Sequence, residues 1–243
     1  MNALAKELGL SPDLTFYDVY SLDEPDLLAH IPRPAYALLV IFPLTPAWRR
    51  DREAEDAALG DSATYYRGGP AGNTGPEPII WFKQTIHDAC GSYGLVHCVV
   101  NGPAAKHILP GSFLDKLRTA ALPLEREERA KLLYDSEEFE RAHQLVAGLG
   151  ESSVPVLRNR ERLGQHFVAY VKANGHLWEL EGSREGPLDR GELDEGEDVL
   201  SPKALARGLK RVMRLDADAG GNDLRFSCIA LAPRSRESVN GPA

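Results

Sequence analysis

Residues 84–97 read QTIHDACGSYGLVH, and this stretch decides how the rest of the chain is interpreted. After Cys90 the polar loop becomes a long apolar run, 90–100, which predicts a core helix that is buried on all sides. Cys90 would begin that helix, where free backbone N–H groups and the helix dipole stabilise a thiolate and lower the pKa of the thiol. Gln84 lies six positions upstream and can direct its side-chain amide at an oxyanion formed beside the sulfur. The stretch therefore predicts a nucleophilic cysteine.

The segments around this helix predict a sheet. Residues 36–42 are continuously apolar, as in a central strand that is buried on both faces. Residues 166–171 and 176–180 flank an Asn-Gly turn and predict a β-hairpin. A helix opening at Ser-Pro 201–202 and an apolar strand over 224–231 complete the pattern. Because a hairpin directly precedes the last helix and strand, we predict an α/β domain of the α+β kind with a mostly antiparallel central sheet flanked by helices.

The remaining segments predict surface helices and one long loop. Residues 148–165 are polar, have no clear period and contain a proline, and loops of that length are usually functional. We find no interdomain linker, so residues 1–233 are predicted to form a single catalytic domain. Residues 234–243 are predicted to be a disordered tail. Amphipathic helices are predicted over 112–121, 125–133 and 136–147.

Composition narrows the class of protein. The 243 residues carry a net charge of −8, which disfavours nucleic acid or an anionic membrane as partners and suits a basic one. The three cysteines give no disulfide framework and fit a reducing compartment. The first residues lack a cleavable apolar signal, and the longest apolar run, 35–44, is too short to cross a bilayer. We therefore expect a soluble monomer of the cytoplasm or nucleus.

A cysteine hydrolase also needs a base and a group that orients the base. His166 is the best candidate for the base, because it opens a strand that would lie against the Cys90 helix. Glu181 ends the return strand of the same hairpin and can approach the far imidazole nitrogen. Taken singly, each residue also has an ordinary explanation: Cys90 as a core residue, His166 as a surface histidine, and Glu181 and Gln84 as loop residues. Only their combination points to catalysis.

Two other kinds of site are disfavoured. His87, Cys90 and His97 could imitate part of a zinc cluster, but a structural zinc site needs four ligands, usually from paired short motifs, and no second pair is present. His97 would also lie two helical turns beyond Cys90, too far along the axis to share one ion. No glycine-rich phosphate-binding motif occurs, so nucleotide binding has no support. We expect no metal and no cofactor.

The same residues carry a family resemblance. Residues 84–97 resemble the active-site signature of the ubiquitin C-terminal hydrolases, which are cysteine peptidases of the papain clan. The likeness covers about residues 3–233, and the chain looks like the short, single-domain members, which implies a papain-like fold. Further matching segments are residues 8–10, 16–20, 31–34, 166–169, 177–182 and 224–231.

The resemblance implies a role for each site residue. Cys90 would be the nucleophile, Gln84 the oxyanion-hole donor, and His166 the general base and then the general acid. Glu181 stands where the family usually has aspartate, and it keeps the charge while adding one methylene. The segment 148–165 would be a crossover loop draped over the active site.

The implied function is that of a deubiquitinating thiol hydrolase with ubiquitin as its partner. The crossover loop implies that small or unfolded adducts are removed from the C-terminal glycine of ubiquitin, through an acyl-enzyme. Two alternatives remain at this point. One is a catalytically weak ubiquitin-binding relative, which the glutamate at position 181 leaves open. The other is a hydrolase of a ubiquitin-like modifier such as NEDD8, because the thiol chemistry would be identical.

Overall fold

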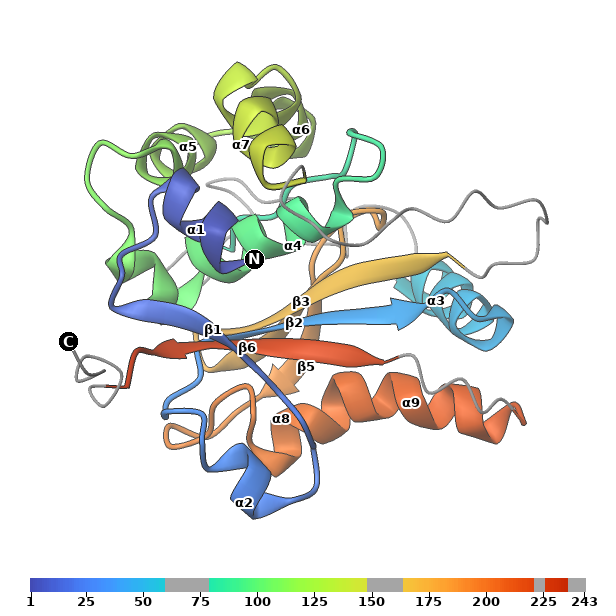
Figure 1. Ribbon diagram of the computed structural model, residues 1–243. Helices are drawn as coiled ribbons and strands as arrows, with labels where there is room; N and C mark the ends of the chain where they lie inside the picture. Colours follow the sequence, from blue (N-terminus) through green and yellow to red (C-terminus); the bar gives the residue numbers. More distant parts are fainter. Residues whose placement is uncertain (60–78, 148–163, 221–225, 236–243) are drawn as a thin grey trace.

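The computed structural model describes residues 1–59, 79–147, 164–220 and 226–235. Within them, six strands form one sheet in the order β1-β6-β2-β3-β4-β5, and all neighbouring strands are antiparallel. The strands are β1 Leu14–Asp18, β2 Ala37–Pro43, β3 Gln165–Ala173, β4 His176–Leu180, β5 Leu188–Glu192 and β6 Ser227–Pro233. Helices cover both faces of the sheet (Figure 1), so the predicted α+β architecture is confirmed.

The centre of the sheet follows the predicted pattern. β2 pairs with β6 on one side and with β3 on the other, and most of its residues are buried, as its continuous apolar run requires. β3 and β4 form the predicted hairpin. Its turn residues Asn174 and Gly175 have φ values of 54° and 77°, the left-handed conformation that an Asn-Gly hairpin turn uses.

Each face of the sheet has its own core, because alternate residues of a strand point to opposite sides. On β2, Leu39 joins the core beneath α4, whereas Leu38 and Val40 join the core against α8 and α9. Figure 1 shows α1 and α4 to α7 above the sheet and α8 and α9 below it. The helices are α1 Asn2–Leu8, α2 Pro25–Leu28, α3 Pro46–Leu59, α4 Cys90–Val100, α5 Phe113–Ala121, α6 Arg126–Tyr134, α7 Glu137–Ala147, α8 Pro202–Arg207 and α9 Leu209–Asp218, with a 3-10 helix at Gly102–His107.

Three elements differ from the sequence prediction. β5 was not predicted, because its sequence LDRGE has no apolar alternation and its place depends on pairing with β4. The helix after residue 201 is divided at Gly208, where a Cβ would lie 3.1 Å from the Tyr170 ring. β6 begins at Ser227, later than predicted.

Two further predictions fall partly outside the described residues. Of the predicted loop 148–165, residues 148–163 lie outside them. Of the predicted tail, Arg234 and Ser235 are held in place: the Arg234 N–H donates to the carbonyl of Asp13, and the Ser235 N–H donates to the hydroxyl of Tyr17. Among the helices that the structure describes, none has the length and apolar character needed to cross a bilayer.

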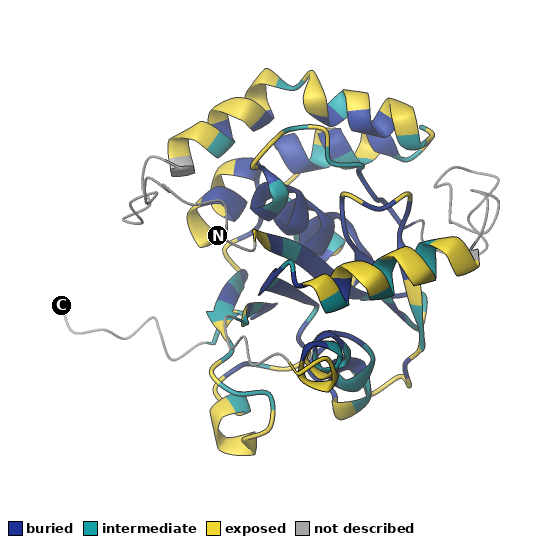
Figure 2. Ribbon diagram, turned by 90° about the vertical axis from the view of Figure 1, so that its right-hand side faces the viewer, coloured by how far each residue is buried: buried dark blue, intermediate teal, exposed yellow. Residues whose placement is uncertain are grey.

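α3 has a special place in this arrangement. It follows β2 directly and lies across the end of the sheet at which β3 begins (Figures 1 and 2). The upper layer of helices lies above it in Figure 2. This end of the sheet is where the predicted site residues meet.

Candidate active site

Cys90 is the first residue of α4, as the sequence predicted. The preceding residue, Ala89, offers no side-chain cap, so the first N–H groups of the helix stay available. The sulfur of Cys90 accepts hydrogen bonds from the backbone N–H groups of Gly91 and Phe167. The start of a helix and the start of a strand therefore both direct donors at one sulfur.

Glycines let α4 approach the sheet closely enough for this contact. A Cβ at position 94 would lie 2.6 Å from Cδ1 of Leu39, and one at position 91 would lie 3.3 Å from the ring of Phe167. Neither distance is tolerable without a shift of the neighbouring side chain. Gly91 and Gly94 in the sequence stretch 84–97 thus set the depth at which Cys90 lies against β3.

His166 is the second residue of β3 and pairs with Phe42 of β2. Its side chain is buried, and its Nε2 donates a hydrogen bond to Oε1 of Glu181 at 2.5 Å. A side-chain hydrogen bond also joins His166 to Cys90. Since Nε2 is taken by the carboxylate, Nδ1 is the nitrogen left for the thiol. The structure therefore brings the predicted nucleophile, base and acid together in one line.

Glu181 directly follows β4 and is fully buried. Besides His166, its Oε1 accepts hydrogen bonds from the backbone N–H and the hydroxyl of Ser183, at 2.7 and 2.6 Å. Its backbone carbonyl accepts a hydrogen bond from Nε1 of Trp81 at 3.1 Å. A buried carboxylate with several donors is held as an anion, which is the state an orienting acid needs.

The electrostatics of the three residues are coupled. Burial raises the pKa of the Cys90 thiol, but the hydrogen bond and charge of His166 outweigh burial and leave that pKa lowered. Burial lowers the pKa of His166, whereas hydrogen bonds to Cys90 and Glu181 raise it to about 9. Burial likewise raises the pKa of Glu181, but His166 and Arg52 lower it to about 2. These directions favour a thiolate–imidazolium pair near neutral pH.

Gln84 lies beside the loop that carries the acid. Its backbone N–H donates to the carbonyl of Gly182 at 2.7 Å, and its side-chain Nε2 donates to the carbonyl of Ile86 at 3.1 Å. A primary amide has two N–H donors, so a second remains for a ligand. A Cβ at Gly182 would lie 2.9 Å from Cβ of Gln84, so a glycine is needed here for the two segments to meet.

One polar stripe, made by His97 of α4 and by Asn101 directly after the helix, holds the segment that leads to Gln84. Nε2 of His97 accepts from the backbone N–H of Phe82 at 3.0 Å. The side chain of Asn101 both accepts from the N–H of Ile80 and donates to its carbonyl, at 2.7 and 2.9 Å. Burial lowers the pKa of His97 to about 4, so its ring is neutral and can accept. The sequence signal for this role is a pair of polar residues four apart on an otherwise apolar helix.

The zinc alternative finds no support in the part of the chain that the structure describes. His97 is committed to the contact with Phe82, and no cluster of three or more His, Cys, Asp or Glu side chains there could hold a metal ion. Cys98 and Cys228 are buried free cysteines. Burial raises the pKa of Cys98 and raises that of Cys228 to about 12, so neither competes with Cys90 as a thiolate.

Sequence reasoning missed three residues around the base and the acid: Trp48 and Arg52 of α3, and Ser183. The ring of Trp48 lies 6.3 Å from that of His166, centroid to centroid. Nη1 of Arg52 lies 3.5 Å from Oε2 of Glu181. α3 reads as an exposed, charged helix, so nothing in its sequence indicates which of its residues face inward.

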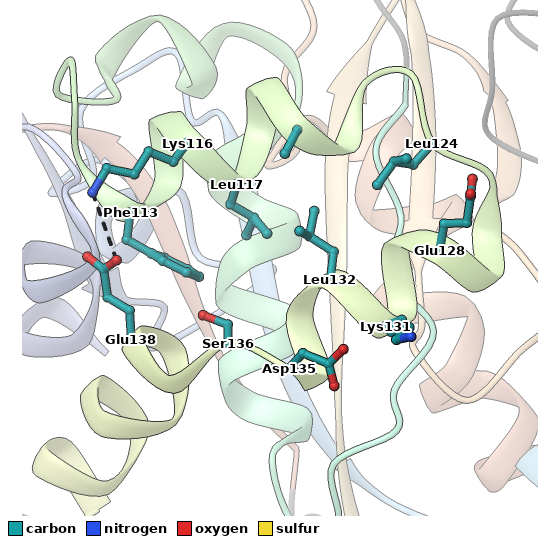
Figure 3. A pocket seen from close by; sticks show the side chains of 11 residues that line it. Phe113, Lys116, Leu117, Leu124, Glu128, Lys131, Leu132, Asp135, Ser136 and Glu138 are labelled. Carbon is teal, nitrogen blue, oxygen red and sulfur yellow. Dashed lines mark ion pairs between the residues drawn. The ribbon is translucent and has the colours of Figure 1, made fainter.

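The surface has a depression beside the candidate base and a larger groove that lies away from it. A depression of about 350 Å³ is bounded by His166, Trp48, Arg52 and Ser183, and so it opens beside the candidate base. A larger groove of about 620 Å³ lies among α5, α6 and the start of α7 (Figure 3). None of its lining residues belongs to the group Cys90, His166, Glu181 and Gln84, so we assign it no part in the chemistry.

Comparison with known proteins gives one consistent family. Residues 1–214 match the model of ubiquitin carboxyl-terminal hydrolase, family 1. The chain is 30% identical over 231 residues to ubiquitin carboxyl-terminal hydrolase isozyme L1 of Monodelphis domestica, covering 95% of this chain and 93% of that protein. It is 36% identical over 197 residues to a ubiquitin carboxyl-terminal hydrolase of Aplysia californica, covering 79% of this chain and 81% of that protein.

A solved structure shares the fold. The catalytic domain of Trichinella spiralis UCH37, bound to ubiquitin vinyl methyl ester, superposes with a TM-score of 0.69 at 20% identity. The match covers 96% of this chain and 91% of that one. At that identity the likeness shows the fold, and it confirms the predicted papain-like architecture.

Proposed function

The chain belongs to family 1 of the ubiquitin carboxyl-terminal hydrolases, and on that premise we propose that it cleaves the bond after the C-terminal glycine of ubiquitin with Cys90, His166 and Glu181. Its family makes it an enzyme of the cysteine-peptidase type. The observation that carries the proposed mechanism is the hydrogen-bonded line from the sulfur through the imidazole to the carboxylate. Such a line supplies a nucleophile, a base and an orienter.

The first half-reaction forms an acyl-enzyme. The thiolate of Cys90 attacks the carbonyl carbon of the terminal glycine, and the carbonyl oxygen becomes an oxyanion. The spare N–H of Gln84 and the backbone N–H of Cys90 stabilise that oxyanion. His166 gives its proton to the leaving amine or thiol as the carbon–heteroatom bond breaks, and a thioester to Cys90 remains.

The second half-reaction releases ubiquitin. His166, now neutral, takes a proton from water, and the resulting hydroxide attacks the thioester carbon. The carbon–sulfur bond breaks, which restores the thiolate of Cys90 beside the protonated His166 and frees the terminal glycine as a carboxylic acid, whose proton passes to solvent. Glu181 stays ionised throughout, since its buried oxygen accepts three hydrogen bonds, and it holds Nε2 of His166 as the donor nitrogen.

The proposed substrates are small or unfolded adducts of ubiquitin. The basis is the crossover loop that the family resemblance implies for residues 148–165, of which 148–163 lie outside the described residues. A related solved catalytic domain is bound to ubiquitin vinyl methyl ester, which supports ubiquitin as the partner. The hydrolysis of a NEDD8-type modifier stays the alternative, because specificity depends on surface residues and the thiol chemistry is shared.

The non-catalytic alternative is disfavoured by the position of the acid. That alternative rested on the glutamate at position 181, whose extra methylene could have displaced the carboxylate. Instead, Oε1 of Glu181 lies 2.5 Å from Nε2 of His166, within range of a charge-assisted hydrogen bond. The departure from the family aspartate therefore leaves the contact to the base intact.

The test is hydrolysis of ubiquitin carrying a fluorogenic C-terminal amide. We expect turnover by the wild-type chain and by Cys228→Ala, whose thiol is buried away from the line of three residues. We expect no turnover by Cys90→Ala, which should still bind ubiquitin. No turnover by the wild-type chain, or undiminished turnover by Cys90→Ala, would refute the proposal. The same amide on NEDD8, and folded diubiquitin, then measure specificity: faster cleavage of either would contradict the proposed substrate class.

A further inference from the structure

The two oxygens of the Glu181 carboxylate have different surroundings. Oε1 accepts all three hydrogen bonds, from His166 and from the N–H and hydroxyl of Ser183. Oε2 is buried and accepts no hydrogen bond from the described residues. Its charged neighbour is Arg52, whose Nη1 lies 3.5 Å away. A half-satisfied buried carboxylate is costly unless an opposite charge faces it.

Arg52 is itself fixed from three sides. Its Nη2 donates to the carbonyl of Ser183 at 2.6 Å, the same residue that donates to Glu181. Its Nε lies 3.7 Å from Oδ2 of Asp56, one helical turn further along α3. Its guanidinium lies 5.4 Å from the ring centroid of Trp48, within the range of a cation–π contact. Few orientations of this guanidinium satisfy all three contacts.

α3 is anchored independently of Arg52. Glu55, on the same helix, accepts from Arg184 at 2.7 Å and from Arg190 at 2.5 Å, and Arg190 also binds Glu179 of β4 at 2.8 Å. These pairs tie α3 to β4, to β5 and to the loop that follows Glu181. The distance from Arg52 to Glu181 is therefore set by a rigid frame.

We propose that Arg52 is a positioning residue, which together with Ser183 clamps the carboxylate of Glu181 against His166 and so lets a glutamate serve as the orienting acid. The inference rests on the proposed function for its catalytic meaning. A glutamate has one more rotatable bond than an aspartate, so a single contact to the imidazole leaves its carboxylate free to rotate. Arg52 removes that freedom, because it binds the second oxygen and the backbone of the residue that binds the first.

Arg52 can shift the pKa of His166 in two ways, directly through its charge or indirectly through Glu181. The two shifts have opposite signs, so the sign of the measured shift distinguishes a clamp from a simple charge effect. The groups that act most strongly on the imidazole are Cys90 from α4 and Glu181 from the end of β4. Four charged residues of α3 line the depression beside it: Arg52, which faces Glu181, and Arg49, Glu53 and Asp56, which Arg52→Gln leaves unchanged. Taken alone, the positive charge of Arg52 disfavours a second positive charge nearby, so its direct effect lowers the pKa of His166. Through the clamp it acts in the opposite direction, because a carboxylate held at Nε2 raises that pKa.

The decisive variant is Arg52→Gln, with Arg50→Gln as the matched control, since Arg50 is an exposed arginine of the same helix. NMR titration of the His166 ring should give a lower pKa in Arg52→Gln and an unchanged one in Arg50→Gln. This readout needs no ubiquitin, so it tests the clamp whether or not the chain cleaves ubiquitin. An unchanged or higher pKa in folded Arg52→Gln would overturn the inference.

Kinetics on the fluorogenic ubiquitin amide supply the second readout. We expect kcat of Arg52→Gln to fall about tenfold, the loss expected for one charged contact, while KM stays within about twofold. In a Glu181→Asp background the shorter acid no longer reaches Arg52, so the same change should cost less than about twofold. Equal losses in both backgrounds would show that Arg52 acts without Glu181 and would refute the clamp.

Arg52→Lys covers the case in which Arg52→Gln does not fold. Lysine keeps the charge but lacks the planar fork that spans Glu181 and Ser183 at once. We expect an intermediate lowering of the pKa of His166 and an intermediate loss of kcat. Wild-type values for Arg52→Lys, in the absence of a folded Arg52→Gln, would also overturn the inference.

Discussion

Shortening the acid by one methylene, in Glu181→Asp, tests whether side-chain length places the carboxylate. From the sequence alone, aspartate at position 181 is the family residue and would be expected to hold or raise the rate. The geometry reverses that expectation. Oε1 of Glu181 lies 2.5 Å from Nε2 of His166, in a backbone frame fixed by the hydrogen bond from Trp81 to the carbonyl of residue 181. In that frame an aspartate falls short of the imidazole.

The magnitude follows from the length that is lost. One carbon–carbon bond is about 1.5 Å, so the nearest oxygen of an aspartate would lie about 4 Å from Nε2 of His166, beyond hydrogen-bond range. A hydrogen bond between charged groups contributes about 1.5–3 kcal/mol. Because 1.4 kcal/mol corresponds to a factor of ten in rate, kcat should fall roughly 10- to 100-fold.

The assay is steady-state hydrolysis of the fluorogenic ubiquitin amide by Glu181→Asp and Glu181→Gln. Glutamine keeps the length and loses the charge, so it serves as the matched comparison. We expect KM to stay near the wild-type value in both, since neither change touches the thiol or the surface. Thermal unfolding confirms that each variant is folded at the assay temperature. A folded Glu181→Asp enzyme with wild-type or higher kcat would refute the reasoning, because position 181 would then tolerate either length.

Three further predictions test the surroundings of the site. Gly182→Ala should lower kcat about tenfold, because its Cβ would lie 2.9 Å from Cβ of Gln84 and displace that side chain. The alkylation of the Cys90 thiol by iodoacetamide should keep its rate, and equal slowing of both reactions would contradict a local effect on Gln84. Asn101→Ala should lower the free energy of unfolding by about 2–4 kcal/mol in denaturant, because it leaves the buried N–H and C=O of Ile80 without their partner. A loss below about 1 kcal/mol would show that these two hydrogen bonds are dispensable for the fold. The pH profile of kcat/KM should fall as pH rises through about 9, the pKa of His166, because the imidazolium that protonates the leaving group is lost; a decline already complete at pH 7 would show that the pair does not form.

The parts of the fold that the sequence predicts well are those set by local chemistry. The continuous apolar run that became β2, the Asn-Gly turn between β3 and β4, and the apolar helix after Cys90 all lie where their patterns indicate. β5 was missed because it has no such pattern of its own. Arg190 of that strand is held by Glu179 and Glu55, so β5 depends on partners that are remote in sequence.

The residues of the candidate site also fall into two groups, those that local sequence indicates and those that depend on remote partners. Cys90, His166 and Glu181 could be proposed because each lies at the end of a predicted element, and ends of elements can converge on one edge of a sheet. Arg52 could not be proposed, since its importance depends on the side of α3 that faces the sheet. His97 was considered only as a metal ligand, because a neutral, buried histidine that accepts a backbone hydrogen bond cannot be distinguished by sequence from one that binds an ion.

The substitution of the family aspartate by glutamate illustrates why a single departure from a motif says little by itself. Judged by side-chain length, Glu181 should misplace its carboxylate. The structure offsets the added length with donors from Ser183 and a facing charge from Arg52, while Gly182 leaves room for the segment that carries Gln84. The position of the acid is therefore a property of four segments together: α3, the residues before α4, the end of β4 and the start of β3. A change at Glu181 or Arg52 should therefore shift the pKa of His166 even where the fold is kept, and that pKa reports whether the carboxylate is held against the imidazole.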